Sequence, residues 1–211
     1  RKLFVVASGE SQLREIWRGV RESRMYTSFG STWHPDGKRV IFLSDTGDRY
    51  GLYTIDASAS KDRPQLLTDP AYDVLSAPGI AGNALFYAGN GVNPYEQHVY
   101  RLSLSGGEPE QITRLAGKNV GYPSPDGRHL AFMHNNDTSP PELYVTSSEG
   151  GDATRITHSP LPAFTERTWV AAEYVSFPSL VDDYTLHARV LKPGNMEPGK
   201  KYPVIFGPVY S

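Results

Sequence analysis

The chain has 211 residues, 38% of them hydrophobic and 11% aromatic, and its basic and acidic residues are interspersed with a formal net charge of −2. This charge pattern offers no basic stripe to a phosphate backbone, and no stretch approaches the roughly 20 apolar residues that span a bilayer, so we expect no nucleic-acid partner and no membrane association. Because there is no cysteine, disulfides, thiolate nucleophiles and cysteine-based metal sites are excluded, while the cellular compartment stays open.

The first segment, residues 1–28, allows two interpretations. Four apolar residues in its second half have helical spacing and predict an amphipathic helix: Leu13, Ile16, Trp17 and Val20. However, Phe4 precedes Ile16 by twelve residues, and the same interval separates Tyr100 from Ile112 later in the chain. That match favours the alternative, in which residues 1–28 are the last two strands of a partial repeat unit.

Three copies of one pattern follow, with a period of about 45 residues. The markers of each copy are a glycine (Gly37, Gly82, Gly127), an aromatic residue (Phe42, Tyr87, Phe132), an apolar-Tyr pair (Leu52-Tyr53, Val99-Tyr100, Leu143-Tyr144) and a closing apolar-Thr pair (Leu67-Thr68, Ile112-Thr113, Ile156-Thr157). Between the markers lie short β-branched and aromatic runs bounded by turn residues, which is typical of strands. A period near 45 with about four strands indicates the blade of a β-propeller. We therefore predict an all-β propeller fragment over residues 1–165, with four-stranded antiparallel blades at 29–69, 71–113 and 117–157.

The Pro-Asp-Gly tripeptides of "HPDGKRVIFLS" and "SPDGRHLAFMH" predict tight hairpin turns. The first should reverse a strand ending near Trp33 into one beginning at Arg39. The strand that follows has four consecutive apolar residues, Val40 to Leu43, where a half-exposed strand would alternate. Such a run indicates burial on both faces, as when twisted sheets stack face to face.

After Thr157 the repeat stops. Residues 166–211 read as a linker followed by strands near 173–177, 184–191 and 203–206, with turns at Asp182-Asp183 and in the Pro- and Gly-rich stretch 192–201. We expect a domain boundary near residues 163–172.

No residue pattern in the chain predicts a metal site, a cofactor or a nucleophile. The six histidines lack ligand spacing, and a Gly-x-Ser-x-Gly nucleophile elbow is absent from the sequence. Asn136-Asp137-Thr138 matches the N-glycosylation pattern, but a polar loop before two prolines explains it as well.

The repeats resemble those of the TolB-type propellers and of the N-terminal propeller of prolyl oligopeptidase family serine peptidases. The tail "EYVSFPSLVDDYTLHARVLKPGNMEPGKKYPVIF" favours the second group. It is similar to the entry into the α/β-hydrolase domain of the dipeptidyl peptidase IV and acylaminoacyl-peptidase branches: a Val-x-Phe strand, an acidic turn, a strand ending in Lys-Pro, then Lys-Tyr-Pro-Val. The resemblance therefore implies that residues 166–211 hold the linker and first strands of a truncated hydrolase domain.

The implied reaction of the parent protein is hydrolysis of peptide bonds in short peptides through a serine acyl-enzyme, with the propeller restricting entry. In this branch a tyrosine just after the Tyr-Pro strand helps to stabilise the oxyanion, and Tyr210 is the residue placed to match. Two features depart from the family. The sequence "FGPVYS" replaces the Gly-Gly-Pro-like loop that usually follows this strand. The chain also contains no Glu-Glu pair, which the aminopeptidase branch uses to bind the amino terminus of its substrate. Since the chain starts with Arg1 and lacks the catalytic Ser, Asp and His, we expect a piece of a longer protein that is inactive alone.

The rival hypothesis is a TolB-like propeller that binds proteins or peptides without chemistry. A Gly-x-Ser-x-Gly motif roughly 80 to 120 residues beyond Ser211, followed by Asp and then His, would decide for the peptidase. Peptide substrates are the expected partners of the parent, whereas its homo-oligomeric state and its localisation stay open.

Overall fold

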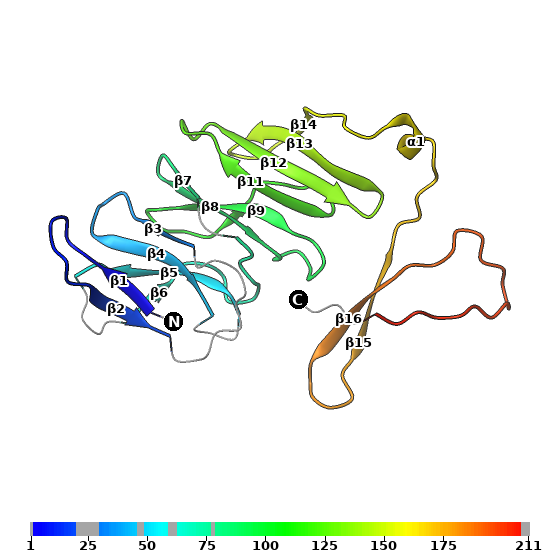
Figure 1. Cartoon of the computed structure of the whole chain (residues 1–211), viewed down its shortest axis with the longest axis horizontal. Coiled ribbons are helices and arrows are strands. Elements are labelled where there is room, and N and C mark those ends of the chain that lie inside the picture. The colour runs from blue at the N-terminus through cyan, green and yellow to red at the C-terminus, as the bar shows by residue number, and fades with distance from the viewer. Residues whose placement is uncertain (1, 20–29, 46–48, 59–62, 77–78, 208–211) are drawn as a thin grey trace. The chain divides into compact units, whose positions relative to one another are not determined.

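The computed structural model describes residues 2–19, 30–45, 49–58, 63–76 and 79–207 (Figure 1). The chain divides into two compact units, Arg1–Leu161 and Pro162–Ser211. The first unit contains strands β1 to β14, and the second contains helix α1 and strands β15 and β16. The division falls next to the linker expected from the sequence.

Three four-stranded antiparallel sheets make up most of the first unit, and in each sheet neighbours in sequence are neighbours in space. The first sheet comprises β3 (Ser31–Trp33), β4 (Arg39–Ser44), β5 (Gly51–Asp56) and β6 (Gln65–Leu66). The second comprises β7 (Gly79–Ala81), β8 (Ala84–Gly89), β9 (His98–Ser103) and β10 (Glu110–Gln111). The third comprises β11 (Lys118–Pro123), β12 (His129–Asn136), β13 (Ser139–Ser147) and β14 (Thr154–Arg155). This is the up-and-down order of propeller blades, which confirms the predicted fold class.

The aromatic markers occupy equivalent places in the three sheets. Each lies on the second strand and pairs across to the tyrosine of the third: Phe42 with Tyr53, Tyr87 with Tyr100, and Phe132 with Tyr144. All three side chains are at most 2% exposed. The repeat that the sequence predicted is therefore a repeat of strand register as well as of residue type.

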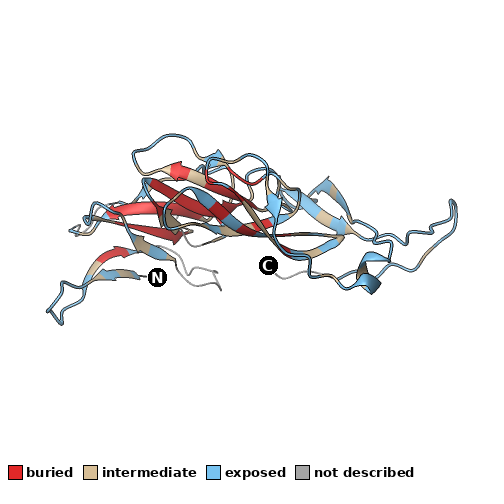
Figure 2. Ribbon diagram, turned by 90° about the horizontal axis from the view of Figure 1, so that it is seen from above, coloured by how far each residue is buried: buried red, intermediate tan, exposed pale blue. Residues whose placement is uncertain are grey.

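The sheets pack face to face, and their strands carry most of the buried residues (Figure 2). One cluster joins Ile41 and Leu52 of the first sheet to Tyr87 of the second. Another joins Phe86 of the second sheet to Phe132 of the third. As predicted, β4 is buried along nearly its whole length, because a neighbouring sheet or hairpin covers each face. Strand β8 is buried in the same way between the first and third sheets. In contrast, β12 alternates between exposed and buried residues from His129 to His134, since the described chain covers only one face of the third sheet.

The marker glycines sit in the turns between first and second strands, where all three have positive φ angles: Gly37 at 67°, Gly82 at 56° and Gly127 at 70°. In the first turn the His34 carbonyl accepts a 3.0 Å hydrogen bond from the Gly37 N–H. The Asp36 carboxylate accepts the N–H of Lys38 at 2.8 Å. These contacts carry out the reversal from Trp33 to Arg39 that the Pro-Asp-Gly sequence predicted.

The closing threonines hold the outer edge of each sheet. In each case the threonine hydroxyl oxygen accepts the backbone N–H of the residue before the marker tyrosine: Thr68 from Leu52 at 3.2 Å, Thr113 from Val99 at 2.9 Å, and Thr157 from Leu143 at 2.9 Å. The short fourth strands end before these residues, so the side chain extends the pairing that the backbone has stopped making. This explains why an apolar-Thr pair closes every repeat.

The N-terminal segment forms a hairpin, so the helical alternative for residues 1–28 is wrong in its described part. Strand β1 (Lys2–Val5) pairs with β2 (Arg14–Arg18), and Phe4 lies opposite Glu15 as Tyr100 lies opposite Gln111. A helix would have buried Leu13 beside Ile16, but Leu13 is 66% exposed while Ile16 is 2% exposed. Residues 20–29 lie outside the described part of the chain.

The second unit contains a single described hairpin. Helix α1 (Pro162–Thr165) is followed by β15 (Glu173–Pro178) and β16 (Thr185–Val190), joined by the expected acidic turn at Asp182. The predicted strand at 203–206 is wrong. Residues Val204 to Phe206 are irregular and between 87% and 98% exposed, because no described segment pairs with their backbone. Within the described residues, no helix is long and apolar enough to cross a membrane.

Candidate functional site

The one catalytic residue expected from the sequence, Tyr210, lies outside the described residues, so its role as an oxyanion donor stays a prediction. Its upstream neighbours, Val204 to Phe206, are exposed and unpaired in the second unit. The buried polar groups of the first unit are the other candidates for a functional role.

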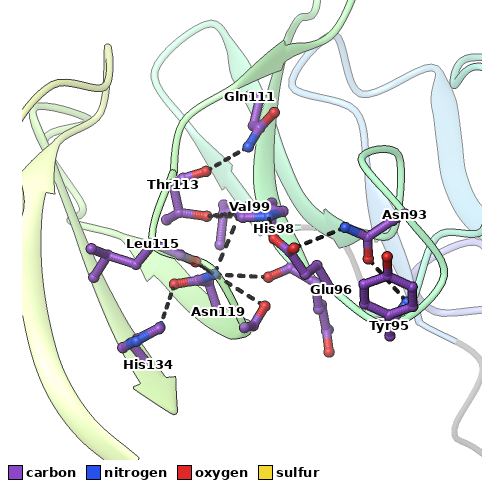
Figure 3. A network of polar contacts seen from close by, with 12 residues as sticks. Asn93, Tyr95, Glu96, His98, Val99, Gln111, Thr113, Leu115, Asn119 and His134 are labelled. Carbon is purple, nitrogen blue, oxygen red and sulfur yellow. Dashed lines mark hydrogen bonds and ion pairs between the residues drawn. The ribbon is translucent and has the colours of Figure 1, made fainter. Parts of the chain in front are cut away.

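A polar seam of His98, Asn119 and His134 lies where the second sheet packs against the third (Figure 3). His98 begins β9, Asn119 lies near the start of β11, and His134 lies near the end of β12, so all three meet at the same end of the two sheets. Their exposed fractions are 1%, 0% and 6%. Buried polar groups of this kind need partners, because each unpaired one destabilises the fold by roughly 1–3 kcal/mol.

The side chain of Asn119 lies at the centre of the seam and hydrogen-bonds to groups on either side of it (Figure 3). Its amide nitrogen donates to the carbonyls of Leu115 at 2.7 Å and Gln97 at 3.0 Å. Its amide oxygen lies 3.0 Å from Nδ1 of His134. Since that oxygen can only accept, His134 carries a proton on Nδ1. The amide thus ties the loop before β9 and the connection after β10 to the third sheet.

The other histidine of the seam, His98, is bonded to residues of the second sheet and its loops. Nε2 of His98 lies 2.9 Å from a carboxylate oxygen of Glu96, and its Nδ1 faces the Thr113 hydroxyl. Although partial burial acts to raise it, the pKa of Glu96 is lowered by hydrogen bonds from Asn93 and His98. Burial lowers the pKa of His134, and the nearby His98 lowers it further. The seam therefore favours a neutral His134 and an ionised Glu96.

A second buried polar group, Glu142, lies where the chain leaves the third sheet. Its carboxylate accepts hydrogen bonds from Ser159 and from the hydroxyl of Thr157, and it lies 3.0 Å from Nη2 of Arg155. The hydrogen bond from Thr157 is the main cause that lowers the pKa of Glu142 to about 2, with Ser159 and Arg155 adding to it. The side chain is 2% exposed. Glu142 fastens the irregular segment after β14 to the third sheet.

A hollow of about 450 Å³ lies between the N-terminal hairpin and the first sheet, and its lining includes Val5, Arg14, Trp33, Lys38 and Asp56. Trp33 is 53% exposed. Ile80 in the second sheet and Pro123 in the third occupy the place that Trp33 has in the first. Both are half-buried, because each packs against the sheet that precedes its own. The hollow therefore follows from a two-stranded hairpin standing where the repeats have four strands, and we assign it no ligand.

One serine–histidine contact occurs in the second unit. Oγ of Ser176 lies 3.0 Å from Nδ1 of His187, its cross-strand partner in the hairpin. Both residues are exposed, and among the described residues no carboxylate is hydrogen-bonded to His187. A nucleophile–base pair needs such an orienting group and an oxyanion hole, so we interpret the contact as a cross-strand pair of the hairpin.

The remaining polar residues singled out from the sequence lie at the surface. Asn136 is the exposed last residue of β12, and its side chain accepts the Thr138 N–H of the turn that follows at 3.0 Å, as expected for a polar loop. No group of three or more metal-ligating side chains gathers anywhere in the described ranges.

The sequence interpretation missed His98, Asn119, His134 and Glu142 as a set. The available signal was a departure from the repeat. Asn119 and His134 stand 45 residues after Val74 and Gly89, and the residue before each apolar-Tyr pair changes from Gly51 to His98 to Glu142. The polar residues thus replace apolar or small ones at fixed places in a repeating sheet.

Comparisons with known proteins agree with this architecture. Residues 4–124 match the family model described as the dipeptidyl peptidase IV N-terminal region. The chain is 25% identical over 200 residues to the "Probable dipeptidyl-aminopeptidase B" of Aspergillus oryzae, covering 89% of this chain and 22% of that protein. It is 29% identical over 136 residues to human dipeptidyl peptidase 8, covering 57% of this chain and 14% of that protein. The chain thus spans about a fifth or less of the length of these curated relatives.

The fold agrees with a solved structure as well. The crystal structure of Porphyromonas gingivalis dipeptidyl peptidase 4 superposes with a TM-score of 0.63 at 19% identity, covering 78% of this chain and 24% of that one. The sheet order, the register of the aromatic markers and the family match over more than half of the residues point the same way. The chain belongs to the dipeptidyl peptidase IV N-terminal region family.

Proposed function

We propose that this chain is the substrate-gating propeller portion of a serine peptidase that hydrolyses peptide bonds in short peptides. The observation that carries the proposal is the stack of three sheets in one register, within a chain whose family match covers residues 4–124. Sheets buried on both faces form a rigid wall, because a packed apolar core deforms little. A rigid wall beside an active site would admit a narrow peptide and exclude a folded protein.

The second unit fits the same proposal as the start of the hydrolase domain. Its β15–β16 hairpin is two-stranded and exposes Tyr174, Phe177 and Leu186, at 37%, 46% and 45%. An isolated two-stranded hairpin with apolar side chains in water is marginally stable, so further strands would be needed to bury it. Residues 203–206, which have no partner in the described chain, are the next apolar segment available to such a sheet.

On this proposal the chain is silent by itself, because the nucleophile elbow is missing from its sequence. The purified chain should neither release the chromophore from dipeptide substrates nor react with a fluorophosphonate serine probe. Stoichiometric labelling of any serine, Ser176 above all, would contradict the proposal.

Gating is tested in the complete peptidase. Leu85→Ala removes a side chain that is 0% exposed in the core between the first two sheets and should loosen the wall. We expect kcat/KM for long peptides to rise relative to that for a dipeptide amide. The matched control is Leu180→Ala, which truncates a fully exposed leucine of the second unit. An unchanged length preference in the Leu85 variant, with the variant folded, would contradict the gating role.

A further inference from the structure

The two joints between neighbouring sheets share one backbone contact. In the first joint, between the first and second sheets, the N–H of Val74 donates to the carbonyl of Tyr50 at 2.8 Å. In the second joint, between the second and third sheets, the N–H of Asn119 donates to the carbonyl of Gln97 at 2.8 Å. Each accepting residue stands just before the third strand of its sheet, so the two bonds lie at the same end of the molecule's sheets. The two joints therefore have the same backbone arrangement at this end.

The side chains around this contact differ between the joints. The seam residues His98, Asn119 and His134 stand where the first joint has Gly51, Val74 and Gly89. The acidic group bound at the first joint is Asp73, whose carboxylate accepts the N–H of Tyr50 at 2.9 Å and lies 3.1 Å from Nη1 of Arg49. An aspartate stays ionised above about pH 5, whereas histidine titrates near pH 6.5. Mild acid therefore acts on the second joint and not on the first.

His134 has no partner for a second proton. Its Nδ1 already binds Oδ1 of Asn119, and its Nε2 has no hydrogen-bond partner in the described ranges. On β13, the ring of Tyr144 stands perpendicular to the imidazole, with the centroids 5.5 Å apart. The cross-strand partner of His134 is Glu142, but that carboxylate is already bonded to Ser159. A charged His134 would therefore be a buried cation with no anion bonded to it, which is an unfavourable state.

His98 also resists a second proton at its Nδ1. Its Nε2 lies 2.9 Å from the carboxylate of Glu96, which is ionised and can only accept, so Nδ1 is the nitrogen left to take up a proton. Nδ1 lies 3.4 Å from the amide nitrogen of Asn119, which is itself a donor, and 3.5 Å from the hydroxyl of Thr113. Glu96 would attract a charge on His98, but such a charge would repel one on His134. Protonation of the seam therefore weakens the contacts of Asn119.

We propose that the second joint opens at its seam end in mild acid while the first joint stays closed. In the open form the two histidines reach water and take up protons, and the N–H of Asn119 leaves the carbonyl of Gln97. Leu130 and Phe132 remain buried against the second sheet, so the opening is local. If the chain is the gating wall proposed above, this joint is where acid would widen it, but the opening itself is a property of the chain.

Hydrogen exchange measured by NMR at single amides compares the two equivalent bonds within one sample. The protection factor of an amide is the exchange rate of an unstructured chain at the same pH divided by the measured rate. Closure is fully stable above about pH 6.5, and each pH unit below that value favours the open form by up to about tenfold per histidine that stays neutral when closed. From about pH 7.5 to about pH 5, the protection factor of Asn119 should fall about tenfold. That of Val74 should change less than about twofold.

Histidine variants assign the effect to the seam. His134→Gln keeps a donor for Asn119 but takes up no proton, so the fall at Asn119 should shrink to about threefold or less, and the double variant with His98→Gln should abolish it. The control is His129→Gln, which changes an exposed histidine of the same strand and should leave the tenfold fall intact. The protection of Val74 reports that each variant is folded.

Three results would each overturn the proposal: equal falls at Asn119 and Val74, which would indicate global unfolding, an unchanged Asn119 in the wild-type chain, or a fall that survives in the double variant. The measurement needs no peptidase activity, so its failure would leave the proposed function untouched.

Discussion

The carboxylate of Glu142 accepts two hydrogen bonds of 2.7 Å from Ser159, one from its backbone N–H and one from its hydroxyl. These contacts span seventeen residues and join the third strand of the last sheet to the segment that leaves it. The pairing of strands ends at Arg155, so Glu142 extends the attachment of the chain beyond the sheet.

Removing the charge of Glu142 should release this segment. Glu142→Gln keeps the shape but weakens the hydrogen bonds to Ser159 and the ion pair with Arg155, so the amide of Ser159 should exchange its hydrogen faster with solvent. Hydrogen exchange followed by mass spectrometry reports this, with the exposed Glu166→Gln as control. Because the pKa of Glu142 is lowered to about 2, its contribution to stability is fully present above about pH 4.5 and is lost as the pH falls towards 2. Unchanged exchange at Ser159 would show that Glu142 does not hold the segment.

The closing threonine of the second sheet should matter through its hydroxyl. Thr113→Val leaves the buried N–H of Val99 without its acceptor and should lower the free energy of unfolding by about 1–3 kcal/mol. Thr113→Ser retains an acceptor and should lower it less. Urea denaturation measures both variants, and Thr154→Val, at an exposed position of β14, serves as control. Equal losses for the valine and serine variants would assign the effect to packing instead.

Acidification should weaken the contact between the second and third sheets. The pKa of His134 is lowered in the folded chain, whereas an unfolded histidine titrates near pH 6.5. The unfolded state therefore takes up more protons, and stability should fall as the pH drops below about 6.5. His134→Gln should reduce this slope between pH 7 and pH 5, as measured by urea denaturation at each pH. The exposed His158→Gln is the control, and an unaltered slope in the His134 variant would contradict the assignment.

If the proposed function holds, Tyr210 is testable only in the complete parent protein. If its phenol donates to the developing oxyanion, Tyr210→Phe should lower kcat by roughly 10²-fold with little change in KM, because that hydrogen bond forms mainly in the transition state. A tyrosine that only packs predicts reduced stability with normal turnover per folded molecule. Steady-state kinetics of the variant, with its folded fraction determined separately, distinguishes the two.

The sheets were predictable because their determinants are local and repeated. The turn at Gly37 depends on a residue that tolerates positive φ, and the same need recurs at Gly127, so the spacing of glycines carried the register of the strands. The strand expected at 203–206 failed for the opposite reason. Its apolar residues are suited to a strand, but a strand also needs a neighbour for its backbone, and local sequence does not report one.

The polar seam was not predictable from motif spacing. His98 and His134 are 36 residues apart and meet only because one lies on the third strand of a sheet and the other on the second strand of the next. An alignment of the repeats indicates the seam, because Asn119 and His134 align with Val74 and Gly89, which carry no polar side chain. The alignment does not show that Asn119 contacts both His98 and His134, because that contact depends on how the two sheets stack.

Three sheets built to one plan could stack in the wrong order while the chain folds, because their apolar faces are alike. Asn119 removes that ambiguity. Stacked on the second sheet, its amide reaches the carbonyl of Gln97 and it lies beside His98. Stacked on the first sheet, it would face Gly51 at the place of His98, with no side chain to meet it. An incorrect order would therefore lose the contact between Asn119 and His98, so the polar seam favours one sequence of neighbours among sheets that hydrophobic packing alone would treat as interchangeable.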